Sequence, residues 1–128
     1  MRRADWLNRL LATIREYTSV RFEFGSHDCA IFSARCVDAM TGSSLAETLN
    51  YKNKRGAFRA ISKEGGLEKA VTNRLGEPVN NHNARRGDIC LIDDTTLGVC
   101  RGDGIVVCSD NKLEIYPLSK AIKHWRIE

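Results

Sequence analysis

Cys29 is the residue of this sequence best placed to do chemistry. It begins a run of mainly apolar residues, 29–40, which is typical of a helix buried in a protein interior. The free N–H groups and the dipole at a helix N-terminus stabilise the thiolate, which is the nucleophilic form of cysteine. Catalysis also requires a base, normally histidine, and a polar group that orients it. Without such partners a cysteine at this position is explained as core packing.

Three histidines are candidates for the base. His27 precedes Cys29 by two residues and could reach the helix end from the loop before it. His82 lies in the polar loop before the first expected strand, and His124 lies near the last one. Each is equally explained as a solvated side chain. Asp28 is placed to cap the helix, and orienting a base would be a second role.

Four helices are expected in the first part of the chain. Residues 5–17 place their apolar side chains on one helical stripe, and residues 29–40 end at Thr41-Gly42, a typical C-terminal stop. Weaker patterns predict helices over residues 55–63 and 67–75. Residues 77–86, which include Pro78, are expected to form a loop.

Beyond Gly87 the pattern changes to short segments rich in Ile and Val, separated by turn signals. The expected strands are residues 88–93, 97–101, 105–108, 113–116 and 124–127. Helices followed by an antiparallel meander predict an α+β fold, in which N-terminal helices pack on a C-terminal antiparallel sheet of about five strands. We expect a single domain over residues 1–128.

Composition narrows the function classes. The formal charge of +4 is well below that of a dedicated nucleic-acid binder, so no specific nucleic acid is expected. No stretch approaches the roughly 20 apolar residues of a membrane span. Charged residues at Arg9, Arg15 and Glu16 interrupt the N-terminal segment, so no export signal is expected. The five cysteines are then expected to be free thiols in a reducing cytosol.

Metal and phosphate sites were weighed as alternatives. The cysteines include no Cys-x-x-Cys pair, so zinc-ribbon spacing is absent and neither a metal nor a cofactor is expected. Cys29 and Cys36 share one helix face, which is explained as a core face. A basic cluster lacks interleaved aromatic residues and is explained as a solvated face or a rim for an acidic partner. It comprises Lys52, Lys54, Arg55 and Arg59, with Arg85 and Arg86 further on.

Four segments resemble the NlpC-type branch of the papain-like cysteine peptidases. Residues 25–32, Gly-Ser-His-Asp-Cys-Ala-Ile-Phe, resemble the Asp-Cys-Ser-Gly-Phe nucleophile motif of that family. Residues 86–91 resemble its Gly-Asp-Leu strand opening, and residues 97–100 and 102–105 resemble its next two strands. The resemblance implies an NlpC-like, papain-like fold with Cys29 as the nucleophile.

The sequence departs from the peptidases at two places. Their catalytic histidine opens the strand that here begins at Thr96, and a threonine hydroxyl is no base near neutral pH. Ala30 and Ile31 also replace the Ser-Gly of the nucleophile motif. The usual Cys–His dyad is therefore broken.

The whole chain is similar to a family of small proteins from tailed phages and prophages. The shared features are an aromatic-x-aromatic-Gly opening at residues 22–25, Asp28-Cys29, and the Thr41-Gly42 helix end. Further along they are Arg-Gly-Asp at residues 86–88, Leu97-Gly98, and an ending over residues 124–127. This resemblance implies that the protein is a tail morphogenesis or tail-tip protein. It also implies that the absence of the catalytic histidine is a trait of the family.

The sequence thus favours a phage tail structural protein, acting in assembly or at the tail tip, with a degenerate NlpC-like fold and no enzymatic activity. Its expected partners are other tail proteins, hub or tip subunits, and its expected location is the bacterial host cytoplasm and the virion tail. The alternative is a cysteine peptidase or peptidoglycan hydrolase that uses Cys29, with His27 or His82 as the base.

Overall fold

The structure is a computed structural model that describes residues 1–20, 22–25, 27–80, 83–93, 95–109 and 113–128. Helices dominate its first part, as the sequence predicts. They are α1 (Trp6–Tyr17), α2 (Cys29–Thr41), the short 3-10 helix η1 (Leu45–Thr48), α3 (Lys54–Lys63) and α4 (Leu67–Leu75). No helix among the described residues has the length and apolar character needed to cross a membrane.

An antiparallel sheet forms the second part. Its strands are β1 (Ile89–Asp93), β2 (Thr96–Cys100), β3 (Ile105–Cys108), β4 (Leu113–Tyr116) and β5 (Lys123–Trp125), with the 3-10 helix η2 (Leu118–Lys120) before β5. The strand order is β4-β3-β2-β1-β5. The first four strands form the expected meander, but β5 returns across the sheet and pairs with β1. The fold is therefore the predicted α+β arrangement of N-terminal helices on a C-terminal sheet of five strands.

The central helix α2 is defined by its two ends. Asp28 is its N-cap, and the carboxylate accepts a hydrogen bond of 2.9 Å from the backbone N–H of Ile31. Gly42 ends the helix in the left-handed conformation at φ 79°, which glycine adopts without a steric penalty. These caps fix where the helix begins, and so they fix Cys29 in its first turn.

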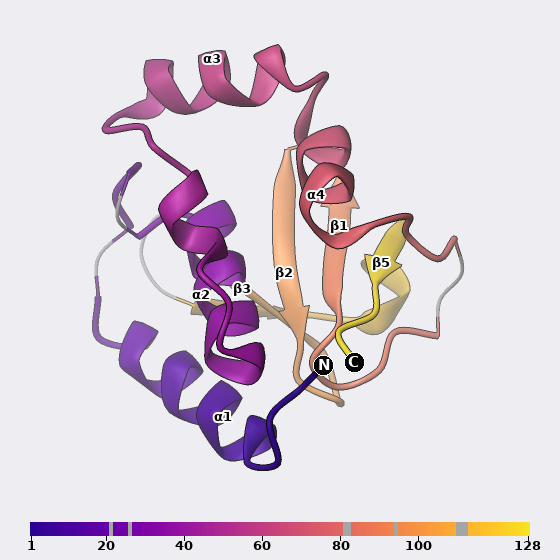
Figure 1. The fold of residues 1–128 in the computed structure, drawn as a ribbon. Coiled ribbons are helices and arrows are strands. Elements are labelled where there is room, and N and C mark those ends of the chain that lie inside the picture. The colour runs from indigo at the N-terminus through magenta and orange to yellow at the C-terminus, as the bar shows by residue number, and fades with distance from the viewer. Residues whose placement is uncertain (21, 26, 81–82, 94, 110–112) are drawn as a thin grey trace.

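The helices cover one face of the sheet (Figure 1). The main core lies between them and includes Leu10 of α1, Phe32 of α2, Val71 of α4 and Trp125 of β5. A smaller cluster lies on the opposite face, where Ile105 packs with the region before β5. Both faces are thus buried, which explains why β1, β2 and β3 are nearly continuous runs of apolar residues.

The cysteines take part in this packing. Cys36, Cys90, Cys100 and Cys108 are buried, Cys29 is half-buried, and all five are free thiols. Within the described part of the chain, no group of three or more His, Cys, Asp or Glu side chains could hold a metal ion.

Candidate functional site

Cys29 faces the turn that joins β1 and β2. Its Sγ lies 4.0 Å from the backbone carbonyl oxygen of Thr95, and Thr96 is the first residue of β2. Both threonines line the same cleft as Cys29. The start of β2 therefore lies beside the cysteine, and threonine occupies it.

The Cys29 cleft, as we call it, has a volume of about 530 Å³. One wall is aromatic, since the Phe24 ring lies 5.0 Å from that of Phe22 and 6.2 Å from that of Phe58. The other wall comes from the ends of β3 and β4. The residues lining the cleft include Phe22, Phe24, Asp28, Cys29, Tyr51, Lys54, Phe58, Thr95, Thr96, Cys108, Ser109, Glu114 and Tyr116.

Asp28 is held in place by three hydrogen bonds. Besides the N–H of Ile31, its carboxylate accepts bonds from the backbone N–H of Gly25 at 3.0 Å and from the Tyr51 hydroxyl at 2.8 Å. The residue is only 2% exposed. A carboxylate so engaged serves as the helix cap and as the anchor of Tyr51, and its place is fixed whether or not a base is present.

The histidines do not contribute to the cleft as far as the structure describes it. His27 exchanges two backbone hydrogen bonds with Glu23, and its ring packs against Tyr17 at a centroid distance of 5.6 Å. His124 is fully buried on β5, where its Nδ1 lies 3.1 Å from a carboxylate oxygen of Asp88. His82 lies outside the described residues.

Burial opposes ionisation of the Cys29 thiol. Desolvation by the surrounding protein and, to a smaller extent, the charge of Asp28 raise the pKa of Cys29 to about 11. Hydrogen bonds from the backbone N–H groups of Leu97 and of the helix terminus favour the thiolate but do not offset the burial. The helix N-terminus therefore does not produce a reactive thiolate here.

A second thiol lies in the same cleft. Cys108, at the end of β3, directs its Sγ to the carbonyl oxygen of His27 at 3.3 Å. Desolvation raises its pKa to about 12, and the proximity of Cys29 and Asp28 adds to the effect. With pKa values raised in this way both thiols are protonated at neutral pH, so the cleft presents weak S–H donors and apolar surface.

Two site residues were missed by the sequence analysis. Tyr51 precedes α3 and is buried through its bond to Asp28, a contact between residues 23 positions apart for which the sequence carries no signal. Cys108 was placed in the correct strand, but its position opposite His27 depends on how β3 packs on α2. Thr96, in contrast, was identified by its place in the motif order.

A family model for a domain of unknown function, DUF6950, matches residues 1–127. The chain belongs to the DUF6950 family. The match includes α1, both walls of the Cys29 cleft and the C-terminal strand, so the cleft lies entirely within the DUF6950 domain. No curated protein matches the chain.

Proposed function

We propose that this DUF6950 protein is a non-enzymatic structural protein of a bacteriophage tail, and that its Cys29 cleft binds a segment of a partner tail protein. The absence of activity is inferred from the environment of Cys29. Its sulfur faces the Thr95 carbonyl, and the pKa of its thiol is raised to about 11. A carbonyl oxygen accepts hydrogen bonds but takes up no proton near neutral pH. The assignment to a tail rests on the sequence similarity described above, as does the description of the fold as a degenerate NlpC-like one.

The cleft has the properties of a surface for a polypeptide. Phe58 is 50% exposed at its edge and lies near the half-buried ring of Phe24. Aromatic side chains are enriched at the cores of protein interfaces. Lys54, whose Nζ lies 5.7 Å from the Phe58 ring centroid, and Glu114 add one charge of each sign to the lining. This mixture suits the side chains of an extended segment of another tail subunit.

Complementation of a deletion tests the proposal. Removing the reading frame from the phage or prophage that encodes it should give particles with absent or defective tails in negative-stain electron microscopy. Wild-type protein and Cys29→Ala should both restore tails, because a scaffold does not need the thiol. Normal tails in the deletion would refute the tail assignment.

Two matched substitutions test the role of the cleft. Phe58→Ala should impair complementation, because it removes the exposed ring at the cleft edge. Ile122→Ala should not, although Ile122 is 46% exposed, since it does not line the cleft. Equal complementation by both variants would show that the partner binds elsewhere.

The alternative function is a cysteine hydrolase acting on peptidoglycan peptides or on a tail polypeptide. The observation in its favour is that Cys29 begins α2 and opens to a cleft large enough for a peptide. This alternative requires that Cys29→Ala, although folded, fails in complementation, and that the wild-type protein releases peptide fragments from purified cell wall. Neither is expected from a thiol that is protonated at neutral pH.

A further inference from the structure

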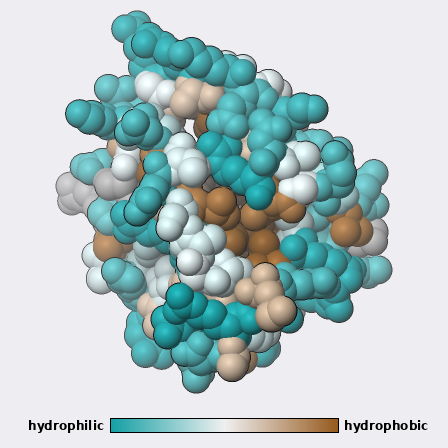
Figure 2. All heavy atoms as spheres, in the orientation of Figure 1, coloured by the Kyte–Doolittle hydropathy of each residue, from teal (hydrophilic) through white to brown (hydrophobic). Residues whose placement is uncertain are grey.

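A second pocket opens between the helices and the sheet and adjoins the Cys29 cleft, with which it shares the lining residues Ala30, Tyr51, Ile61 and Leu67. It lies between α2, η1, α3 and α4, and we call it the interhelix pocket. Its walls include Ala34 and Val37 of α2, Leu49 after η1, Ala60 of α3 and Leu75 of α4. Figure 2 shows hydrophobic side chains gathered in a hollow of the surface between these elements, with hydrophilic residues around the opening.

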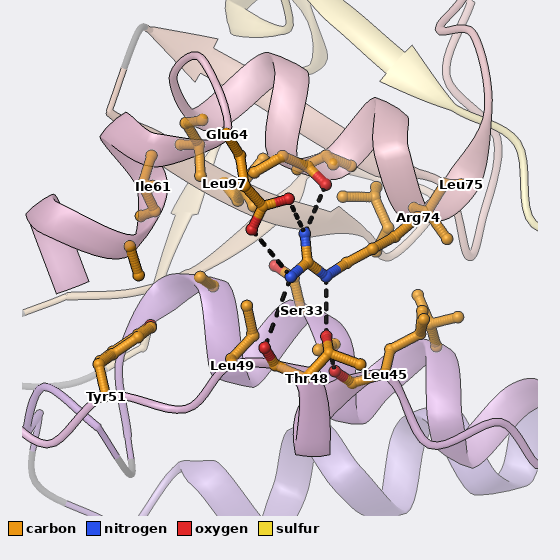
Figure 3. Close-up of a pocket in the computed structure, with 18 of the residues that line it drawn as sticks. Ser33, Leu45, Thr48, Leu49, Tyr51, Ile61, Glu64, Arg74, Leu75 and Leu97 are labelled. Carbon is orange, nitrogen blue, oxygen red and sulfur yellow. Dashed lines mark hydrogen bonds and ion pairs between the residues drawn. The ribbon is translucent and has the colours of Figure 1, made fainter. Parts of the chain in front are cut away.

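One polar side chain in this wall is without a partner. Ser33 of α2 is 3% exposed, and its hydroxyl has no hydrogen-bond partner among the described residues. In Figure 3 the Ser33 side chain points from α2 into the pocket. A buried polar group that lacks a hydrogen-bond partner destabilises the folded protein, so such groups are normally satisfied. The hydroxyl is therefore available to a ligand.

The charged residues at the pocket satisfy one another. The Arg74 guanidinium donates hydrogen bonds to both carboxylate oxygens of Glu64, at 2.8 and 3.0 Å, and to the Thr48 hydroxyl at 2.8 Å (Figure 3). It also donates to the Ala70 carbonyl oxygen at 2.8 Å. Because this pair carries no net charge and its donors are occupied, the pocket selects an uncharged ligand.

Size limits the ligand further. The pocket volume is about 60 Å³, less than half of the roughly 150 Å³ of an engineered apolar cavity that holds benzene. By the same proportion a group of about two or three carbon atoms, such as the branched end of a short aliphatic chain, fills it. Water is a poor occupant, since it needs two to four polar partners and the lining is mostly apolar. An aliphatic group that carries one polar atom satisfies both the apolar wall and Ser33.

We propose that the interhelix pocket binds the branched end of a small, uncharged aliphatic group that carries one hydrogen-bonding atom. The polar atom bonds to the Ser33 hydroxyl, and the alkyl part packs against α2 and α4. The same chemistry is offered by a free small molecule and by a valine or leucine residue of a polypeptide, with its backbone amide. This site does not depend on the proposed function of the Cys29 cleft.

Titration with 2-methyl-1-propanol, followed by amide chemical shifts in NMR spectra of the full chain, tests the site. Saturable shifts at Ser33, Ala34 and Ala70 are expected. Ser33→Ala should weaken binding about 2- to 10-fold, the worth of one hydrogen bond. Ala60→Leu should abolish it by filling the pocket, since Ala60 is a half-buried wall residue with room to grow.

The control variant is Ser62→Ala, an exposed serine on α3 outside the pocket, which should bind like the wild type. Ethylene glycol should give no saturable shifts, because it lacks the alkyl part. Circular dichroism verifies that each variant is folded. If Ala60→Leu does not fold, Ser33→Ala still tests the site, because it removes only the hydroxyl oxygen. Absence of saturation, or equal affinity in wild type and Ser33→Ala, would overturn the proposal.

A blocked amino acid, N-acetyl-valine N-methylamide, distinguishes the two sources of the ligand. If it binds at least tenfold more tightly than the alcohol at the same residues, the pocket takes a side chain of a partner polypeptide. If it binds no better, the pocket takes a free small molecule. Both results require the shifts to depend on Ser33, and shifts that do not depend on Ser33 contradict either assignment.

Discussion

At the scale of single residues, opposing effects act on the ionisation of the Cys29 thiol. The helix N-terminus and the Leu97 N–H favour the thiolate, whereas desolvation and the neighbouring Asp28 disfavour it. The balance leaves the pKa of the thiol at about 11. At pH 7 roughly one molecule in 10,000 then carries the thiolate, far too few for efficient nucleophilic catalysis.

The first prediction concerns alkylation of this thiol. The rate of iodoacetamide labelling at Cys29, located by peptide mass spectrometry, should be negligible at pH 7 and should rise steadily up to pH 10, without a plateau. The reason is that only the thiolate reacts and the pKa of Cys29 is raised to about 11. Cys29→Ala gives the background from the other cysteines. A plateau below pH 8 would contradict the assignment of an inactive thiol.

The second prediction restores the missing partner. Thr96→His places an imidazole at the start of β2, opposite Cys29, where its positive charge would stabilise a thiolate. The pKa of Cys29 should fall, and labelling at pH 7 should accelerate about 10-fold or more. Thr18→His, at the exposed position that follows α1, is the matched control and should change nothing. Unchanged labelling in Thr96→His would mean that Thr96 does not occupy the position of the base.

The sequence predicted the chemistry of single residues only where that chemistry is local. Asp28 was identified as the cap because the carboxylate binds an N–H three residues on. The bond between Tyr51 and Asp28, the contact between Cys29 and Thr95, and the unpartnered Ser33 hydroxyl all depend on tertiary packing. Helical periodicity places Ser33 in a buried helix, but it gives no information on the gap that faces it.

At the scale of elements, one ion pair connects the end of α3 to α4. Glu64 immediately follows α3 and bonds to Arg74 in the last turn of α4. The hydrogen bonds from Arg74, and then those from Asn73, hold the pKa of Glu64 below its ordinary value despite partial burial. Because Arg74 also bonds to Thr48, this pair connects α4 to η1 as well.

The third prediction is the pH dependence of this attachment. A carboxyl with a lowered pKa in the folded state stabilises the protein fully above its unfolded pKa of about 4.3, and that stability is lost as the pH falls through the folded pKa. The difference in free energy of unfolding between wild type and Glu64→Gln should therefore be constant from pH 6 to 8 and shrink below about pH 4. Urea unfolding measures it.

A double-mutant cycle isolates the pair. In an Arg74→Met background, Glu64→Gln should have little effect at any pH, because the partner of the carboxylate is gone. Asp5→Asn is the comparison at an exposed ion pair, that of Asp5 with Arg9, where a smaller effect is expected. A difference that grows as the pH falls would contradict the assigned direction of the Glu64 shift.

The elements themselves were largely predictable. The limits expected for the four α-helices and the five strands agree with the observed ones to within two residues, since caps, glycine turns and Ile- and Val-rich runs mark them locally. The position of β5 was not predictable in the same way. The sequence suggested a continuous meander, but β5 pairs with β1. On the other edge of β5, His124 forms a backbone bridge with Val79, which lies in the loop before β1. Such long-range pairing leaves no periodic signal.

At the scale of the whole molecule, both ends of the chain enter the same core. Leu10 of α1 and Trp125 of β5 are fully buried in the main cluster, and Ile127 beyond β5 is 5% exposed. The termini lie close together in Figure 1. A core shared by the first and last elements predicts that the chain unfolds as one cooperative unit. A destabilising substitution at either end should therefore lower the stability of the whole domain.

The final prediction tests this cooperativity with two matched pairs of variants. Leu10→Ala and Ile127→Ala each remove buried methyl groups and should each lower the free energy of unfolding by about 2–5 kcal/mol. Their exposed neighbours provide the controls. Leu11→Ala, at 38% exposure, and Ile122→Ala, at 46%, should change it by less than about 0.5 kcal/mol.

Cooperativity requires that two probes report the same transition in every variant. Far-UV circular dichroism follows mainly the helices, and tryptophan fluorescence includes Trp125 in the C-terminal strand. For Leu10→Ala and for Ile127→Ala the two melting curves should coincide and shift together, because the core that links α1 to β5 is lost in one step. If Ile127→Ala shifted the fluorescence transition alone, β5 would detach from a helical part that remains folded. The positions of α2 and β2 on either side of Cys29 would then be fixed without the C-terminal strand, and the cleft would not require the whole DUF6950 domain.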